Sequence, residues 1–224
     1  MTIRTLTQFE KKFIDKMVLA GVKTEWEFAV FLETQDGPLI ELISRMKDNG
    51  ADPSLDVHNK AKTIKTIVVH HNHLRDKSLG CADWHGIATL FCETYAHCSD
   101  GTIYYGRVIN KERIKNLGDR LKGDLLEEAE KHLIKELNSN FNHPSLDEFD
   151  NPIIASFFDR EVLNRALRIK NLVDYGCQWG TARTYSSTVG TLNILGIDNL
   201  GELGKLFESN IETSAQDFAN SKIW

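Results

Sequence analysis

The hydrophobic positions of the N-terminal half change from helical to extended spacing. Thr7 to Ala20 places apolar side chains three and four positions apart and is followed by Gly21, which predicts an amphipathic helix ending near that glycine. Apolar runs at 27–34 and 39–44 flank the turn sequence Gln35-Asp36-Gly37-Pro38, so we expect a β-hairpin there. The polar stretch 47–62 predicts a loop with at most one short helical turn.

A β-branched run from Thr63 to Val69 predicts a buried strand that leads into a histidine-rich segment. Residues 84–93 fit a helix, and a second hairpin is expected at 95–109 around Asp100-Gly101. The second half changes character. Helical spacing dominates 121–137 and 159–173, turn formers at 142–152 separate these two helices, and a last helix is expected to end near Ala219.

These elements predict an α/β protein in which helices flank a mixed β-sheet, followed by a mainly helical C-terminal half. We expect a core at 1–110 and a helical extension at 111–224 that packs on it.

Composition and charge narrow the classes of partner. The chain has 224 residues, a formal net charge of -5 and a pI near 5.9, so a nucleic-acid partner is not favoured. No apolar run reaches the roughly 20 residues that span a bilayer, and a membrane partner is not expected. The four cysteines form no CxxC pair and no N-terminal apolar leader is evident, which predicts reduced thiols in a cytoplasmic protein.

The candidate chemistry lies where the β-branched strand ends. His71 and His73 are two positions apart, so both imidazoles should point to the same face. Asp83 follows ten positions after His73, at the start of the expected helix, and could add a carboxylate oxygen. Two histidines and one carboxylate leave a fourth tetrahedral position for water, which is typical of catalytic zinc. The sequence therefore predicts a Zn²⁺ site at His71, His73 and Asp83.

With these residues in place, the chain resembles the JAMM (MPN-plus) metalloprotease family over roughly 7–109. That family shares a glutamate before the first hairpin, then His-x-His, then Ser-x-x-Asp. The resemblance implies an MPN-type, cytidine-deaminase-like architecture, and a zinc-dependent hydrolase that cleaves a peptide or isopeptide bond in a protein or peptide substrate, ubiquitin-like conjugates included. It also implies that Glu27 is the general acid/base.

The sequence departs from the family pattern at several positions. Val30 stands where the family has glycine, and Leu74 where it has proline. Gly80 replaces the serine that helps to hold the oxyanion; Ser78 is the candidate that would take over this catalytic role. Glu25 and Glu33 are close enough to compete with Glu27 as the acid/base.

Other functions fit part of the pattern. Loss of the serine would suit a non-catalytic, MPN-like protein-interaction module. A metal-dependent nuclease is another alternative, although the consecutive His71-Asn72-His73 differs from the dispersed residues of HNH nucleases. A zinc deaminase is disfavoured because the Pro-Cys-x-x-Cys half of its signature is absent.

Overall fold

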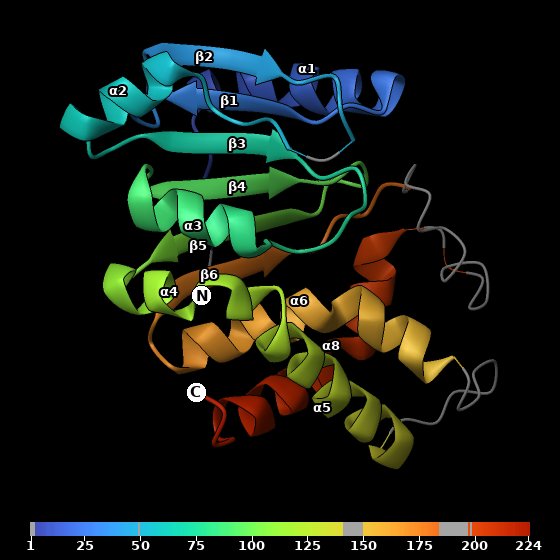
Figure 1. Ribbon diagram of the computed structural model, residues 1–224. Helices are drawn as coiled ribbons and strands as arrows, with labels where there is room; N and C mark the ends of the chain where they lie inside the picture. Colours follow the sequence, from blue (N-terminus) through green and yellow to red (C-terminus); the bar gives the residue numbers. More distant parts are fainter. Residues whose placement is uncertain (1–2, 49, 141–149, 184–196, 198) are drawn as a thin grey trace.

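The computed structural model describes residues 3–48, 50–140, 150–183, 197 and 199–224. Within these ranges the protein is α/β, with one mixed sheet of six strands in the order β2-β1-β3-β4-β5-β6 (Figure 1). Pairing is antiparallel except between β3 and β4. The mixed sheet flanked by helices is as the sequence predicts. No helix among the described residues has the length and apolarity needed to cross a membrane.

The strands are β1 (Phe28–Leu32), β2 (Leu39–Ser44), β3 (Val68–Asn72), β4 (Glu93–His97), β5 (Ile103–Val108) and β6 (Val173–Gln178). The helices are α1 (Gln8–Thr24), α2 (Leu55–Thr63), α3 (Cys81–Thr89), α4 (Lys111–Leu117), α5 (Asp124–Asn140), α6 (Asn151–Ile169) and α8 (Leu200–Ala219), with a short 3₁₀ turn, η1, at Gly118–Leu121.

Both expected hairpins and the opening helix form. Thr7 caps α1 by accepting from the Glu10 backbone N–H, while the Glu10 carboxylate accepts from the Thr7 N–H, which is a complete capping box. One segment differs from expectation. The polar stretch before β3 contains a nine-residue helix, α2, capped by Ser54 and held by buried Val57 and Ala61. Residues 141–149, which include most of the expected turn at 142–152, lie outside the described residues.

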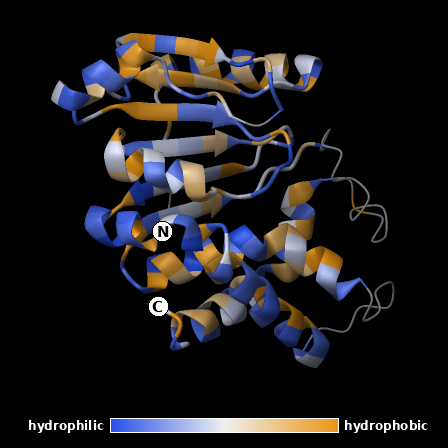
Figure 2. Ribbon diagram, in the orientation of Figure 1, coloured by the Kyte–Doolittle hydropathy of each residue, from blue (hydrophilic) through white to orange (hydrophobic). Residues whose placement is uncertain are grey.

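Side chains that alternate between the two faces of the sheet separate two apolar layers. Val30, Val68 and Tyr95 face α1, whereas Ala29, Phe31 and Val69 face the side of α2 and α3. Figure 2 shows apolar residues on β1, β2 and the first part of β3, and hydrophilic residues at the end of β3. Because β3 is buried over its full length, its last residues lie at fixed positions at the edge of the core.

The second half is not purely helical. Strand β6, which the sequence pattern does not predict, pairs with β5 from Val173 to Gln178. Helices α5, α6 and α8 gather beyond β6 at that end of the sheet (Figure 1). One continuous hydrophobic cluster includes Trp84 of α3, Tyr104 of β5, Phe158 of α6 and Phe207 of α8. The two expected halves therefore share a sheet and a core.

Candidate metal centre

The end of β3 and the start of α3 bring His71, His73 and Asp83 together. Their ligand atoms all lie within 4.8 Å of one another. The His71 Nε2 and His73 Nε2 atoms are 2.9 Å apart, and Asp83 Oδ1 lies 3.1 Å from His71 Nε2. Asp83 Oδ2 is 3.9 Å from His73 Nε2. Tetrahedral ligands about 2.05 Å from zinc are separated by about 3.3 Å, so the spacing of these donors fits such an ion.

Neighbouring groups orient two of the three donors. His73 Nδ1 lies 2.6 Å from the Lys77 carbonyl oxygen, and donation of Nδ1–H to that oxygen leaves Nε2 with its lone pair free for a metal. The Gly80 backbone N–H donates to Asp83 Oδ2 at 2.7 Å, which fixes the carboxylate at the first turn of α3. Support of this kind is usual around metal ligands.

Burial and mutual charge shift the pKa of each donor. Burial lowers the pKa of His73 to about 4, and the charge of His71 acts in the same direction. Burial also opposes the charged forms of His71 and Asp83. Their mutual attraction is stronger, however, so the pKa of His71 is raised and that of Asp83 is lowered. His73 and Asp83 are therefore held as a neutral imidazole and an ionised carboxylate, which are the forms that bind a divalent cation, whereas the raised pKa of His71 means that a metal ion there competes with a proton.

Of the three candidate glutamates, Glu27 is the one that shares hollows with His71, His73 and Asp83. It precedes β1 and lines one hollow with His71 and Asp83, and a second hollow with His73 and Asp83. Its carboxylate accepts from the Gly50 N–H at 2.6 Å. Burial raises the pKa of Glu27, which suits a group that accepts and returns a proton.

Glu25 and Glu33, the two competing glutamates, make other contacts. Glu33 pairs with Lys60 at 2.8 Å on the surface. Glu25 is the exposed C-cap of α1 and lines a different pocket, on the α1 side of His73.

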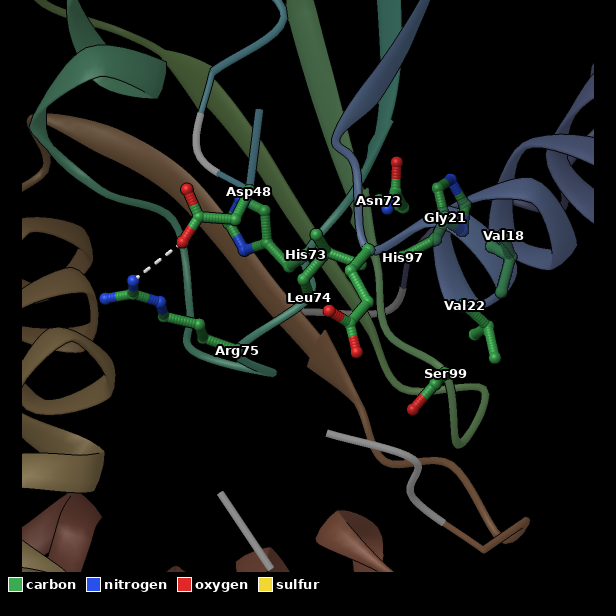
Figure 3. Close-up of a pocket in the computed structure, with 11 residues that line it drawn as sticks. Val18, Gly21, Val22, Asp48, Asn72, His73, Leu74, Arg75, His97 and Ser99 are labelled. Carbon is green, nitrogen blue, oxygen red and sulfur yellow. Dashed lines mark hydrogen bonds and ion pairs between the residues drawn. The ribbon is translucent and has the colours of Figure 1, made fainter. Parts of the chain in front are cut away.

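That pocket is shown in Figure 3. It has a volume of about 250 Å³, and His73, Asn72 and His97 line it together with residues of α1. At its rim Arg75 pairs with Asp48 at 3.0 Å. His73 therefore borders open space on the α1 side as well as on the side that Glu27 and Asp83 share.

The structure does not bring Ser78 to the cluster. Ser78 is 3% exposed, and its hydroxyl lies 2.7 Å from the Tyr175 hydroxyl and accepts from Asn164 Nδ2 at 2.9 Å. Tyr175 in turn donates to Glu161. Ser78 thus belongs to a buried polar network between the loop before α3, α6 and β6. This corrects the expectation that its hydroxyl takes the place of the missing serine.

One residue beside the cluster was missed by the sequence reasoning. Arg160 of α6 lines the same hollow as Glu27, His73 and Asp83. Its position depends on the packing of α6 against the loop before α3, across about 80 residues of sequence. No local pattern around Arg160 indicates this contact.

Comparisons of the chain with protein-family models, with curated proteins and with solved structures find no match.

Proposed function

We propose that this chain is a zinc-dependent hydrolase of the JAMM type that cleaves a peptide or isopeptide bond. The observation that carries the proposal is the convergence of His71, His73 and Asp83 on one point, with Glu27 in the same hollow. Two imidazoles and one carboxylate are a donor set typical of catalytic zinc. The order of elements also supports the proposal. A helix, a hairpin, the strand that leads to the histidines, a helix and a second hairpin occur in the sequence that the resemblance implies, with α2 as an additional helix between the first hairpin and β3.

The residues divide the work of amide hydrolysis between them. His71, His73 and Asp83 would hold the metal, which when bound lowers the pKa of a coordinated water to about 7 and polarises the scissile carbonyl. Glu27 would take the proton from the attacking water and return it to the leaving amine, a role worth on the order of 10²- to 10⁴-fold. Its raised pKa favours this return, because the protonated carboxyl persists closer to neutral pH.

Open space on both sides of His73 suits a chain that passes through the site. The pocket of Figure 3 lies on the α1 side, and a cavity of about 300 Å³ lies on the side of α6. A protein or peptide substrate could place the residues flanking its scissile bond in these two spaces. This supports a peptide or an isopeptide as the substrate class, with ubiquitin-like conjugates among the candidates to test.

The metal site is tested by measuring zinc in the purified chain. We expect about one zinc per chain in the wild type and a loss in His71→Ala. His85→Ala is the matched control, since His85 lies on α3 and contacts Cys81 Sγ at 3.7 Å. Equal zinc in the wild type and His71→Ala would exclude the proposed ligands.

The catalytic role is tested separately. We expect Glu27→Gln to keep its zinc and to lose at least about 10²-fold in cleavage of labelled peptides and isopeptide conjugates. Glu33→Gln, which removes a carboxylate paired with Lys60 on the surface, should leave cleavage unchanged. Equal rates in the wild type and Glu27→Gln would remove Glu27 from the mechanism.

A non-catalytic MPN-like interaction module is the second candidate. It is favoured by one observation: Gly80 has no side chain at the position of the family serine, and the Ser78 hydroxyl is held elsewhere. Zinc-loaded protein that binds a conjugate without cleaving it would support this alternative.

A further inference from the structure

The hollow on the α6 side of the proposed metal centre is lined by Arg160, whose guanidinium has no role in the mechanism proposed above. Glu27, His73 and Asp83 line it together with Arg160 and Lys122. Two acidic side chains and two cations therefore face a cavity of about 300 Å³ next to the proposed ligands.

The guanidinium of Arg160 lies beside Gly80. A Cβ atom on Gly80 would be 3.2 Å from Arg160 Nη1 and 3.3 Å from its Cζ. The Gly80 N–H donates to Asp83 Oδ2, so the same residue contacts the proposed ligand and adjoins the arginine. Arg160 thus occupies the space into which a side chain at position 80 would extend.

Most of the hydrogen-bonding capacity of Arg160 is unused. A guanidinium has five N–H donors, and the side chain of Arg160 makes one long hydrogen bond within the described part of the chain, from Nη1 to the Ser78 carbonyl at 3.4 Å. None of the ion pairs among the described residues includes Arg160, and the carboxylate of the adjacent Asp159 lies 3.7 Å from Lys77 Nζ.

Arg165, on the same helix, differs from Arg160 in its number of partners. Its guanidinium is bound by Glu161, Glu208 and Glu212, so α6 carries one saturated arginine and one that is open to a ligand. The other cation of the hollow, Lys122, is 65% exposed and paired with Asp119 at 2.9 Å. Arg160 is therefore the better donor for an anionic oxygen in this cavity.

We propose that Arg160 binds the oxygen that becomes negatively charged when water adds to the scissile carbonyl, and afterwards the carboxylate of the product. This inference rests on the proposed hydrolase function. As the water oxygen bonds to the carbonyl carbon, the C=O π electrons move to the carbonyl oxygen and Glu27 takes the water proton. When the C–N bond breaks, those electrons re-form C=O and the amine leaves with the proton from Glu27. The carboxylic acid formed then gives its remaining proton to solvent and becomes the product carboxylate. Arg160 supplies positive charge and N–H donors to this oxygen, and no proton moves to or from it.

The experiment measures binding of a product-like anion rather than turnover. Zn²⁺ has no visible d-d spectrum, so Co²⁺ is loaded in its place as the reporter. The probe is N-acetylglycine, whose carboxylate is the group that amide hydrolysis leaves, and its dissociation constant is read from the visible spectrum of the bound Co²⁺.

We expect Arg160→Met to bind one Co²⁺ as the wild type does but to bind N-acetylglycine about tenfold or more weakly, because a charge-assisted hydrogen bond is lost. Lys122→Met removes the same charge from the rim of the same hollow and should change the dissociation constant less than about threefold. Arg160→Gln keeps a neutral polar side chain and serves if the methionine variant does not fold; the same weakening is expected.

Unchanged affinity in a folded, Co²⁺-loaded Arg160 variant would overturn the role of Arg160, as would the absence of any spectral response in the loaded wild type. Neither result would affect the metal site. If instead the wild type and His71→Ala take up equal Co²⁺, the proposed metal centre itself fails before N-acetylglycine is added.

Discussion

Glu10 shows how one buried charge is stabilised on the face of the sheet opposite the metal centre. Its side chain is fully buried, accepts from Arg4 and from the Thr7 N–H, and lies 3.1 Å from His70 Nε2. His70 in turn contacts His97 at 3.0 Å. Glu10 therefore connects the N-terminal segment and the first turn of α1 to the middle of the sheet.

We expect Glu10→Gln to lower the free energy of unfolding by about 2–3 kcal/mol, because Arg4 and His70 lose a charged partner in a buried setting. Arg4 keeps its contact with Glu93 at 2.7 Å, which limits the loss. Urea unfolding measures the change. Glu112→Gln, at an exposed pair with Lys115, is the control and should stay within about 0.5 kcal/mol.

The same residue predicts an acid-dependent loss of stability. Burial alone would raise the pKa of Glu10, but hydrogen bonds from Arg4 and His70 outweigh burial and lower it to about 2, from an ordinary 4.5. The folded protein therefore binds fewer protons than the unfolded chain between these values. The contribution of Glu10 is complete above about pH 4.5 and is lost as the pH falls toward 2. Unfolding free energy should decrease more steeply over this range in the wild type than in Glu10→Gln; parallel curves would contradict the assignment.

At the scale of elements, Asn72 joins α1, the start of β1 and the end of β3. Its side chain accepts from the Phe28 N–H at 2.7 Å and donates to the Trp26 carbonyl at 3.2 Å, so it holds the two residues on either side of Glu27. Helix α1 approaches so closely that a Cβ on Gly21 would lie 2.1 Å from Asn72 Nδ2. The residue between the two histidines thus helps to place the proposed acid/base.

A double-mutant cycle tests this junction. Gly21→Ala should cost about 1–3 kcal/mol because the new methyl group must displace the Asn72 amide. In an Asn72→Ala background the same change should cost at least about 1 kcal/mol less, since the obstructing atoms are gone. Gly123→Ala is the control, because a Cβ there would meet the nearest atom at an ordinary 3.4 Å. Additive effects at Gly21 and Asn72 would show that the helix does not press on this side chain.

Spacing within single elements predicted much of the candidate site, and packing between elements determined the rest. The i, i+2 spacing predicted one face for His71 and His73, and although β3 ends at Asn72 their Nε2 atoms do lie 2.9 Å apart. The helix start after a short loop brings Asp83 to them. The path of that loop, which turns Ser78 toward Asn164, depends on α6 and has no signature in the loop itself. The position of Arg160 and the pairing of β6 with β5 have the same origin, because both arise when the second half of the chain packs on the first.

At the scale of the whole molecule, this shared packing predicts that residues 1–110 do not fold independently. Without the second half, β5 loses its pairing with β6, and Trp84 Nε1 loses its hydrogen bond to Asn164 at 2.8 Å. The apolar side chains that α3 and β5 bury against α6 and α8 would become exposed to water. We expect the 1–110 fragment to show no cooperative thermal transition and little near-UV circular dichroism, and addition of 111–224 to restore both. A fragment that melts cooperatively and binds one zinc would show that the sheet edge at β5 is complete without β6, and that the proposed metal centre forms before the helices dock.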